Sequence, residues 1–578
     1  MTKDEKDQKL HNIRHSLAHL LAAAVLELYP DAKRTIGPSI DNGFYFDFEF
    51  STPISDSDLP KIEKTMRKIL PTWTTFERSE LNGEDAKKEY PGNPYKHELI
   101  DEFTKDGSKV SFYKSGEYWD LCKGGHVDNM KEIKGDSFKL DRVAGAYWRG
   151  DEKNKMLTRI YGLAFETKEE LDAYLKQREE AEKRDHKKLG KELGLLMFHE
   201  TAPGMPYWLP KGLILYKELE NYWRKRHAEL NYQEIASPLV NKAELWKISG
   251  HWDHYKDDMF IADMGENEVY GIKPMNCPNA MIVFKSMQTS YRDLPLRLSD
   301  TDRLHRYERS GTLNGLLRCR SFQQDDAHNY ITEDMIESEY KSIMEICKEF
   351  YGIFNLEYKF RLGTRPKEFL GDVETWDKAE KALHNVLEKS DKEYSVAEGD
   401  GAFYGPKIDI IMKDAIGRDW QMGTIQLDFQ QPRRFELEYT DKDGKNKTPV
   451  VIHRVIYGSL ERFIGILIEH TAGAFPLWLA PVQVKVIPVR ENHNEYAKGI
   501  YELLKAQGIR AELDIEDKNL GGKVRDAKNN KMPYWIVIGD KEIEAEKITL
   551  ESRDAGNLGQ MGKDEMLAKL AEEIKNKK

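Results

Sequence analysis

A highly charged helical stretch about one third of the way along the chain limits how the whole sequence can fold. Residues 167–190 read TKEELDAYLKQREEAEKRDHKKLG, with a Thr that can cap a helix and almost no apolar stripe. A helix that is polar on nearly all sides usually bridges two domains rather than lying in a core. The full chain of 578 residues is also too long for one hydrophobic core. We therefore predict several domains, with the first boundary in this helix.

Hydrophobic periodicity differs on the two sides of this helix. Before it, residues 10–29 predict an amphipathic helix ended by Pro30, the stretch GFYFDFEF predicts a strand, and DLPKIEKTMRKIL predicts a second helix. From Val482 onward, apolar strands alternate with helical stretches, which is typical of a small α/β domain with a parallel sheet. The predicted segments are 1–165, the linker helix 166–190, 191–480 and 481–578.

Composition excludes several classes of protein. Charged residues make up 33% and apolar residues 39%, no run of 18 apolar residues occurs, and the charged N-terminus lacks the apolar core of a signal peptide. We expect a cytoplasmic protein that does not cross a membrane. The net charge of −11 argues against a generic nucleic-acid coat protein, although KRDHKKLGK at 183–191 could be either a local basic surface or a solvated helix face.

The four cysteines are scattered and form no CxxC pair, which excludes a disulfide framework and a structural zinc ribbon. A metal could use them only singly. They are Cys122, Cys277, Cys319 and Cys347.

Two pairs of metal-ligating residue types share one spacing. His15 and His19 lie one helical turn apart, and Cys122 and His126 in DLCKGGHV have the same four-residue separation. By themselves the two histidines could be metal ligands, proton carriers or polar residues on a solvated stripe. A site needs further convergent groups.

The stretch DRLHRYERSGTLNGLLRCRSFQQDDAH, residues 302–328, carries the strongest sign of nucleotide binding. It predicts two strands flanking a loop with Gly311 and Gly315, and inward-facing arginines on such a pair can clamp phosphates. A salt-bridged surface hairpin would have the same composition. Neither GxGxxG nor a complete Walker loop occurs. The charged side chains on the two strands are Arg306, Glu308, Arg318 and Arg320.

At this point the chain resembles a known family. HRYERSG with RCRSF resembles motif 2 of the class II aminoacyl-tRNA synthetases, NYQEIASPLV resembles motif 1, and GSLERFIGILIE resembles motif 3. Within that class SGHWDHYKDDMF, KPMNCP, QQDDAH, AFYGPKIDI and DWQMGTIQLDF are similar to the threonyl-tRNA synthetases. The resemblance runs along essentially the whole chain.

The resemblance implies an α/β multidomain fold with an α+β editing domain (1–165), a class II core built on an antiparallel sheet of six or seven strands (191–480), and an α/β anticodon-binding domain (481–578). It implies ATP-dependent ligation of L-threonine to tRNA(Thr) through a threonyl-adenylate, with Mg²⁺ on ATP. It also implies a homodimer formed partly through motif 1.

The same resemblance assigns roles in the core. Arg306 would hold the α-phosphate and Arg318 the γ-phosphate, beside Glu308 of the same motif, and adenine would lie between Phe322 and Arg462. Asp326 would accept the threonine hydroxyl proton, and His251 would help proton transfer at the tRNA ribose. The residues expected around the substrate are Asp326, Tyr404, Lys407, Gln421 and Gln426, and the catalytic group is Arg306, Arg462, His251 and Lys407.

A zinc ion, one per subunit, is implied on Cys277, His328 and His453. Three protein ligands leave a coordination position for substrate. Valine is nearly isosteric with threonine and lacks the hydroxyl that such a site requires. Serine keeps the hydroxyl and loses one methyl, which is worth only about 10- to 200-fold in discrimination. A second, hydrolytic step is therefore expected.

The pattern HxxxH followed by CxxxH resembles the editing domain of this family, which hydrolyses serine attached to tRNA(Thr). Metal-free hydrolysis and a second zinc site both remain open for this tetrad. The implied editing residues are His15, His19, Lys96, Asp120, Cys122 and His126.

The chain departs from the family in three places. We expect the ubiquitin-like module common in the family to be missing before the first helix, CKGGH stands where CRGPH is common, and CPNA stands where CPGH is usual. Two other hypotheses are kept: a synthetase-like protein that only binds or deacylates tRNA, and a synthetase for serine or proline. The intact motif arginines and zinc-ligand triad argue against the first. The joint presence of triad and tetrad argues against the second.

Overall fold

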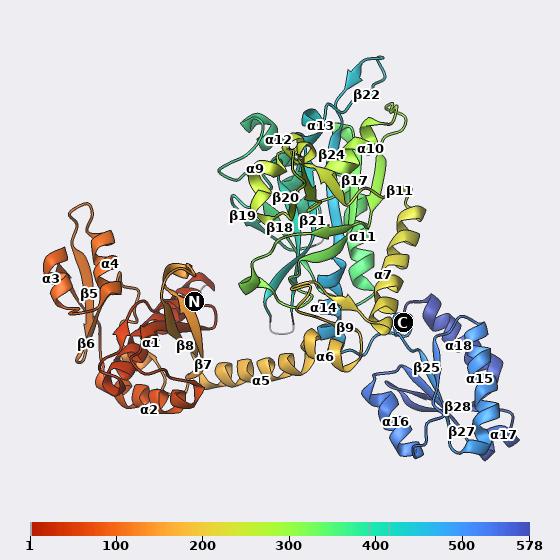
Figure 1. Ribbon diagram of the computed structural model, residues 1–578, viewed down its shortest axis with the longest axis horizontal. Coiled ribbons are helices and arrows are strands. Elements are labelled where there is room, and N and C mark those ends of the chain that lie inside the picture. Colours follow the sequence, from red (N-terminus) through yellow and green to blue (C-terminus); the bar gives the residue numbers. More distant parts are fainter. Residues whose placement is uncertain (1–2, 267, 391, 415–416) are drawn as a thin grey trace. The chain divides into compact units, whose positions relative to one another are not determined.

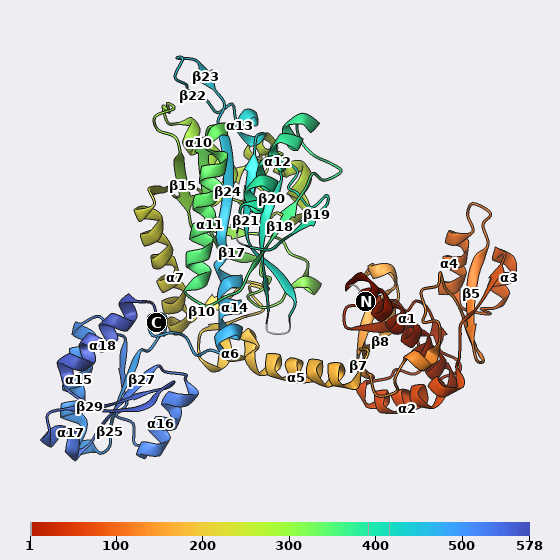
Figure 2. The same cartoon turned by 180° about the vertical axis from the view of Figure 1, so that it is seen from behind.

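The structure, a computed structural model, describes residues 3–266, 268–390, 392–414 and 417–578. It divides into two units, residues 1–179 and residues 180–578, coloured red to orange and yellow to blue in Figures 1 and 2. The division falls inside the charged stretch from which the sequence predicts a domain boundary.

Helix α1 (Lys3–Leu28) packs on an antiparallel sheet in the first unit. Its side chains Leu17, Leu21 and Val25 are fully buried against Phe44 and Phe46 of that sheet's core. Helix α2 (Leu59–Ile69) packs beside α1, so the two predicted helices and the predicted strand are confirmed. The sheet has the order β1-β3-β8-β7 with β2 paired to β3, and its strands are β1 (Lys33–Arg34), β2 (Ser39–Ile40), β3 (Gly43–Glu49), β7 (Phe138–Tyr147) and β8 (Met156–Ala164).

A smaller antiparallel sheet brings a second part of the chain toward α1. It has the order β4-β5-β6, with helices α3 and α4 before β5. Because β6 ends at Leu121, the chain leaves the sheet at Cys122 and reaches the middle of α1 by His126, which stacks on His15. The elements are β4 (Glu77–Leu81), α3 (Gly83–Lys88), α4 (Pro94–Phe103), β5 (Val110–Ser115) and β6 (Tyr118–Leu121).

The charged stretch forms two helices instead of the single one predicted. Helix α5 (Lys168–Arg184) ends before Asp185, whose extended ψ of 121° breaks the helix and whose carboxylate accepts from the first amides of α6 (His186–Glu192). Aspartate is a preferred helix cap, and this cap was overlooked in the sequence pattern. Of the described residues of α5, Leu171 alone is buried.

A nine-stranded sheet organises the second unit. Its order is β11-β15-β17-β24-β21-β20-β18-β19 with β16 paired to β17, and it is antiparallel except for the pairs β11–β15 and β18–β19. The two extra parallel edge strands account for the difference from the six or seven strands expected. The strands are β11 (Tyr232–Glu234), β15 (Leu296–Asp300), β16 (Arg303–His305), β17 (Ser321–Ile331), β18 (Lys359–Gly363), β19 (Tyr394–Ala397), β20 (Lys407–Lys413), β21 (Asp419–Asp428) and β24 (Val450–Ser459).

Helices pack against this sheet and bury a large apolar core (Figures 1 and 2). Helix α14 follows β24 directly and lies against both β17 and β24. The packed helices are α7 (Pro210–Glu229), α11 (Ile336–Gly352), α12 (Val373–Glu388) and α14 (Leu460–Thr471).

The two predicted strands around the arginine-rich loop are shorter than expected. Strand β16 ends at His305 and β17 begins at Ser321. The expectation that strands carry these charged residues is therefore wrong, because the backbone of 306–320 folds as turns stabilised by local hydrogen bonds. The residues on this connection are Arg306, Glu308, Arg318 and Arg320.

The last part of the chain forms a five-stranded sheet of mixed direction with the order β26-β25-β27-β28-β29. Its first three strands are parallel, as predicted, whereas β28 and β29 are antiparallel and join through a short turn, which a parallel pair could not do. The elements are β25 (Val484–Pro488), α15 (Asn494–Ala506), β26 (Ala511–Leu513), α16 (Leu520–Asn529), β27 (Tyr534–Ile538), α17 (Asp540–Glu544), β28 (Ile548–Ser552), β29 (Gly556–Met561) and α18 (Lys563–Lys575).

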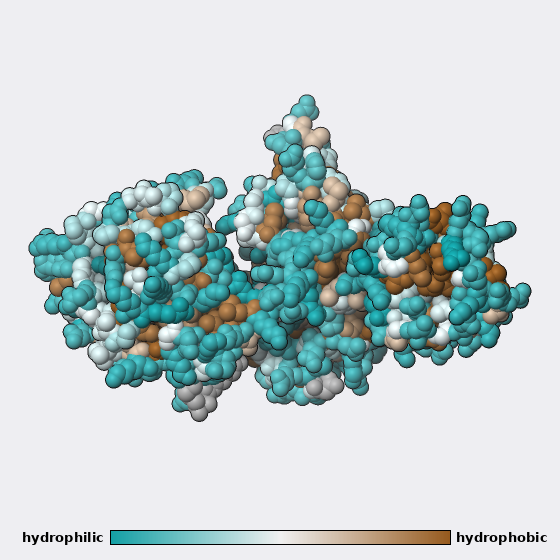
Figure 3. Space-filling view, turned by 90° about the horizontal axis from the view of Figure 1, so that it is seen from below, coloured by the Kyte–Doolittle hydropathy of each residue, from teal (hydrophilic) through white to brown (hydrophobic). Residues whose placement is uncertain are grey.

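Hydrophilic residues predominate on the face drawn in Figure 3, and hydrophobic residues form separate patches there. Within the described ranges, no helix has the length and apolar character needed to cross a membrane.

Candidate functional site

A buried group of one cysteine and two histidines lies at the centre of the large sheet. Strands β17 and β24 pair in antiparallel register with His328 directly opposite His453. Cys277 is the first residue of helix α10 (Cys277–Lys285). One donor atom from each residue lies within 4.8 Å of the others, so the structure brings together three residues that are far apart in sequence.

The chemistry of these donors fits a zinc ion. Among the described residues, neither ring nitrogen of His328 nor Nδ1 of His453 has a hydrogen-bond partner, although these atoms are buried. Buried polar atoms normally have partners, and an imidazole that lacks one is available as a metal ligand. Nε2 of His453 donates to the Asp428 carboxylate at 2.8 Å, which leaves Nδ1 unprotonated and able to bind.

A cavity of about 530 Å³ opens above this group, beside the arginine-rich connection. Thirteen of the residues singled out in the core line it: Cys277, Arg306, Glu308, Arg318, Phe322, Asp326, His328, Tyr404, Lys407, Gln421, Gln426, His453 and Arg462.

The cationic wall of the cavity is held in place by backbone and carboxylate partners. The Arg306 guanidinium lies 5.2 Å from the ring centre of Phe322, and Arg318 donates to Glu308 at 3.0 Å. Arg462, on the first turn of α14, donates to the carbonyl oxygens of Leu317 (2.9 Å) and Gln421 (2.6 Å). Three guanidinium groups around one cavity suit an anionic ligand such as a nucleotide.

Near Cys277, His328 and His453 the cavity is lined by polar side chains that have hydrogen-bond partners within the protein. Asp326 accepts from Asn276 at 3.2 Å, and the Tyr404 hydroxyl donates to Gln426 at 2.6 Å. Burial raises the pKa of Asp326 to about 6. A carboxylate so placed can accept a hydrogen bond from a substrate hydroxyl.

Asp409, which was not predicted from the sequence, orients two of these groups. Asp409 is fully buried, pairs with Lys407 Nζ at 3.1 Å and accepts from Gln421 Nε2 at 2.7 Å. Lys407 and Asp409 alternate on one face of β20 between buried isoleucines. That polar alternation in KIDII was the available signal. Gln324 also lines the cavity and was not singled out.

His251 is placed differently from the other core residues. It is fully buried and is not among the residues lining the cavity. Its Nδ1 lies 2.7 Å from Ser249 Oγ, and its Nε2 lies 4.0 Å from Cys277 Sγ. Burial lowers the pKa of His251 to about 3, so the ring is neutral at neutral pH.

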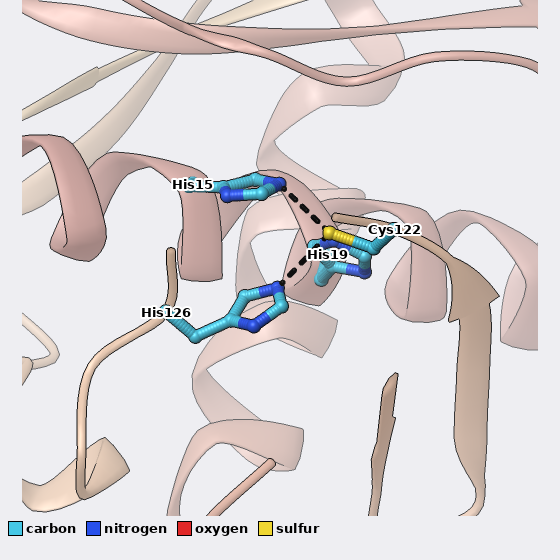
Figure 4. A group of neighbouring side chains, drawn as sticks. All are labelled: His15, His19, Cys122 and His126. Carbon is cyan, nitrogen blue, oxygen red and sulfur yellow. Dashed lines mark hydrogen bonds between the residues drawn. The ribbon is translucent and has the colours of Figure 1, made fainter. Parts of the chain in front are cut away.

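The second cluster lies in the first unit and contains all four residues of the tetrad (Figure 4). His15 and His19 come from α1, and Cys122 and His126 come from the loop after β6. Cys122 Sγ lies 3.4 Å from His15 Nε2 and 3.6 Å from His126 Nε2, and the four donor atoms lie within 4.8 Å of one another. These separations fit a tetrahedral metal site or a group surrounding one water molecule.

Protonation states in the tetrad follow from burial. Burial lowers the pKa of His15 and His19 and brings that of His126 to about 3, so all three imidazoles are neutral near pH 7. Burial raises the pKa of Cys122 to about 11, so in the absence of a metal its sulfur is a thiol. A thiol is a weak nucleophile, whereas a neutral imidazole can accept a proton from water.

A buried ion pair lies beside the tetrad. Lys96 Nζ donates to Asp120 at 2.7 Å, and the two side chains are 2% and 1% exposed. Tyr90 and Tyr118 also donate to this carboxylate, at 2.6 and 3.0 Å. His15, His19, Lys96, Asp120 and Cys122 line one pocket of about 500 Å³, so five of the six proposed editing residues share it.

The altered loop CKGGH has a conformation that proline could not adopt. Gly125 has φ +91°, and its carbonyl oxygen lies 3.3 Å from His15 Nδ1. Proline is restricted to φ near −65°. Glycine at this position therefore gives the loop a different path from the one that a CRGPH sequence would take.

Two cationic residues of α16, Lys523 and Arg525, differ in accessibility. Lys523 is 5% exposed and donates to the carbonyl of Asp514 at 3.0 Å. Its ammonium is used inside the fold, whereas Arg525 is exposed and free of such a burial constraint.

Comparison with known proteins covers three regions of the chain. Residues 260–471 match the tRNA synthetase class II core domain (G, H, P, S and T). Residues 483–573 match the anticodon binding domain, and residues 110–161 match the second additional domain of threonyl and alanyl tRNA synthetases.

Relatives of similar length exist in bacteria. A threonine–tRNA ligase of Caldanaerobacter subterraneus subsp. tengcongensis is 50% identical over 577 residues, which is 100% of this chain and 89% of the relative. One from Acetivibrio thermocellus is 50% identical over 566 residues, which is 98% of this chain and 88% of that protein. Among solved structures, the RNA binding domain of threonyl-tRNA synthetase from Cryptosporidium parvum Iowa II has 41% identity and a TM-score of 0.65, covering 67% of this chain and 98% of that one.

Proposed function

This chain belongs to the threonine–tRNA ligases, a family of class II aminoacyl-tRNA synthetases, and from that premise we propose how its two sites divide the work. The cavity of the second unit activates threonine and transfers it to tRNA(Thr). The pocket of the first unit hydrolyses tRNA(Thr) that carries serine by mistake, in keeping with the match to a second additional domain.

The observation that carries the proposal is the convergence of two chemistries in one cavity. Arg306, Arg318 and Arg462 line the same cavity of about 530 Å³ as Cys277, His328 and His453. The first group suits phosphates and the second suits a zinc ion. A nucleotide and an amino acid can therefore meet there.

In the first reaction we assign these residues to positioning and charge neutralisation. The threonine carboxylate attacks the α-phosphorus of ATP, the bond to the bridging oxygen breaks, and pyrophosphate leaves with its electron pair. Arg306 neutralises the α-phosphate, Arg318 neutralises the leaving group, and Phe322 and Arg462 stack on adenine. A Mg²⁺ ion bound with ATP would supply further positive charge to the phosphates. Lys407, held by Asp409, supports the reacting carboxylate and phosphate.

In the second reaction the terminal ribose hydroxyl of tRNA attacks the adenylate carbonyl, and AMP leaves. The part of the chain that matches the anticodon binding domain would select tRNA(Thr). We propose a homodimer that acts in the cytoplasm, where its substrates are found. His251, buried beside Cys277, keeps its assignment to proton transfer as a part of this proposal.

Selection of threonine over valine follows from the polar end of the cavity. A zinc ion on Cys277, His328 and His453 would offer a coordination position to the substrate's hydroxyl and amine. Asp326 accepts the hydroxyl hydrogen bond, and Tyr404, Gln421 and Gln426 surround the amino acid. Valine leaves these buried polar groups without partners, which costs far more than a missing methyl.

Threonine-dependent exchange of pyrophosphate into ATP tests the first activity. Purified protein should catalyse exchange with threonine, weakly with serine and not with valine or proline. Arg462→Ala should reduce exchange by about 100-fold, in line with loss of a charge that faces the transition state. Arg553→Ala, outside the cavity, is the matched control. Absence of exchange by zinc-loaded wild-type protein would exclude the assignment and favour a protein that only binds or deacylates tRNA.

Hydrolysis in the first unit needs a water molecule and a proton acceptor. Neutral His15, His19 and His126 can orient and deprotonate the water, which then attacks the ester carbonyl, and the tRNA ribose oxygen leaves and is protonated. The protonated thiol of Cys122 argues against a cysteine nucleophile. Lys96, held by Asp120, places an ammonium hydrogen-bond donor in the same pocket as His15 and His19.

Hydrolysis of seryl-tRNA(Thr), with threonyl-tRNA(Thr) as control, tests this second activity. We expect serine to be released and threonine to be retained. The same preparation decides between the metal-free site and a second zinc. One zinc per chain with hydrolysis resistant to chelator supports the metal-free site, and two zinc ions per chain support a metal in the tetrad. No hydrolysis above the control would contradict the editing proposal.

A further inference from the structure

A buried histidine outside both sites contacts the backbone of the arginine-rich connection. His186 is the first residue of α6 and is 1% exposed. Its Nδ1 lies 2.7 Å from Glu469 Oε1 at the end of α14, and its Nε2 lies 3.0 Å from the backbone N of Leu316. None of the functions assigned above uses this side chain.

The two hydrogen bonds determine the tautomer of the ring. A backbone N–H can only donate, so Nε2 of His186 accepts from Leu316 and carries no proton. Nδ1 therefore carries the proton and donates to the Glu469 carboxylate. The imidazole acts as a rigid bridge between helix α14 and the backbone at Leu316.

The backbone around Leu316 is attached to α14 a second time, by an arginine side chain that lines the cavity. Arg462, at the start of α14, donates to the carbonyl of Leu317 at 2.9 Å, one residue after the amide that His186 holds. Arg318 follows directly. The backbone that carries Arg318 is thus connected to both ends of one helix, by Arg462 at its first turn and by Glu469 through His186.

Close packing leaves this segment little freedom to move. Gly315 has φ +52°, and a Cβ there would lie 2.3 Å from His186 Nε2. On α14, a Cβ at Gly465 would lie 3.2 Å from that of Leu316 and 3.1 Å from the Leu317 side chain. Both glycines let the connection approach α6 and α14 so closely that the histidine can reach the backbone.

We propose that His186 is a positioning residue for nucleotide binding, one that holds the backbone of residues 314–318 so that Arg318 and Arg462 face the nucleotide. This inference rests on the proposed role of the cavity in binding ATP. His186 touches no substrate, and it acts on the reaction only through the place of the arginine-bearing backbone.

Three substitutions at this position separate the two hydrogen bonds. In His186→Gln the side-chain amide can occupy the place of Nε2 and accept from Leu316. In His186→Asn the shorter amide can reach Glu469 but not Leu316. His186→Ala loses both. Because a buried N–H without a partner is costly, we expect the Ala and Asn variants to weaken binding of Mg·ATP and to raise KM for ATP by about tenfold, and the Gln variant to stay within about twofold of wild type.

The measurements are calorimetry with Mg·ATP, and pyrophosphate exchange with ATP and threonine varied separately. KM for threonine should stay within about twofold in all variants. His493→Ala is the matched control: it removes a 1% exposed histidine that likewise accepts from a backbone N–H, of Arg490, and pairs with a carboxylate, Asp540, but lies in the region matching the anticodon binding domain. Nucleotide binding by that control should equal wild type.

The outcomes distinguish this inference from the proposed function. Equal ATP affinity in wild type, Ala and Asn variants would overturn the positioning role, as would equal losses in the Asn and Gln variants. A tenfold loss of ATP affinity confined to the Ala and Asn variants supports the positioning role. If the Ala variant does not fold, the comparison of the Asn variant with the Gln variant decides alone. Wild-type protein that binds Mg·ATP but lacks threonine-dependent exchange would contradict the proposed function while leaving this test intact.

Discussion

At the scale of single residues, Asp428 shows how a side chain outside a donor set can determine its chemistry. Its Oδ2 accepts from His453 Nε2, and its Oδ1 accepts from the backbone amides of Gln430 and Gln431 at 2.7 and 2.9 Å. The carboxylate is fully buried and cannot rotate without losing these bonds. It therefore fixes both the tautomer and the ring orientation of His453.

Replacing Asp428 should weaken metal binding more than it weakens the fold. For Asp428→Asn we expect zinc affinity to fall by about 10- to 100-fold, the range typical of carboxylates that hydrogen-bond to a metal-binding histidine. Competition with a chromophoric chelator measures it. Asp372→Asn, which removes an exposed carboxylate that caps helix α12 by accepting from a backbone N–H group, is the control. Unchanged zinc affinity in the Asp428 variant would contradict the assignment of His453 as a ligand.

The buried pair of Lys96 and Asp120 makes the first unit sensitive to acid. Burial alone would raise the pKa of Asp120, but the charges of Lys96 and Arg34 outweigh it and hold that pKa well below its ordinary value. A carboxyl whose folded pKa is depressed stabilises the fold fully above its unfolded pKa, near 4, and loses this contribution as the pH falls further. Below about pH 4 the first unit should lose on the order of 1 kcal/mol per pH unit from this group.

The variant Asp120→Asn tests the pair directly. It leaves the 2% exposed Lys96 without its charge partner, which for buried pairs costs about 3–5 kcal/mol. Urea unfolding of the first unit, followed by tryptophan fluorescence, should show this loss at pH 7 and a smaller difference from wild type at pH 3. Asp106→Asn, at an exposed position, should match wild type. A constant difference at both pH values would refute the pH dependence.

At the scale of elements, the turn from β24 into α14 links the sheet to Arg462. Gly458 has φ +78°, and a Cβ there would lie 1.9 Å from the carbonyl oxygen of Met422. Its amide donates to the buried Asp325 carboxylate at 3.0 Å. A side chain at this position would move the start of α14 away from β21.

Gly458→Ala should therefore affect stability and nucleotide binding together. We expect a loss of about 2 kcal/mol or more in the free energy of unfolding, from the positive φ and the clash, and a higher KM for ATP. Gly444→Ala is the control that carries backbone strain without a clash. Gly444 also has φ +78°, but a Cβ there meets no atom within 4 Å. If both variants bind ATP equally well, the turn does not position Arg462.

Two secondary-structure elements differ from those predicted from local sequence patterns. Asp185 divides the charged stretch into α5 and α6, and the connection 306–320 forms turns where strands were expected. At Asp185 a capping carboxylate accepts from the first amides of α6, and along 306–320 both turn carbonyls and distant partners, such as His186 for Leu316, accept from the backbone amides. Periodicity of side chains does not report such bonds.

At the scale of the whole molecule, helix α5 joins the two units, and its residues are mostly exposed or half-buried. Since Leu171 alone is buried among its described residues, opening this helix costs little free energy. Limited trypsin digestion should cut first among its lysines and arginines and yield two stable fragments, near residues 1–180 and 180–578. Analysis by mass spectrometry identifies the cut. First cleavage outside α5 would contradict the two-unit description.

Much of the molecule was readable from its sequence. Local patterns predicted the helix of residues 10–29, the strand after it and the α/β alternation at the end of the chain. They also contain the motifs that resemble a class II synthetase of the threonine family. Both are readable because side-chain periodicity and motif spacing are properties of neighbouring residues. The family and the enzyme class are confirmed by relatives that match nearly the whole chain.

Tertiary structure alone decided which buried polar groups meet. The strand register puts His328 opposite His453, and Asp409 and Asp428 lie where they orient lysine, glutamine and histidine side chains. His186 reaches a backbone amide 130 residues away. The packing of α6, α14 and the central sheet determines these hydrogen-bond partners. A buried donor or acceptor bonds to whichever partner the folded chain brings within about 3 Å, and no local stretch of sequence contains that information.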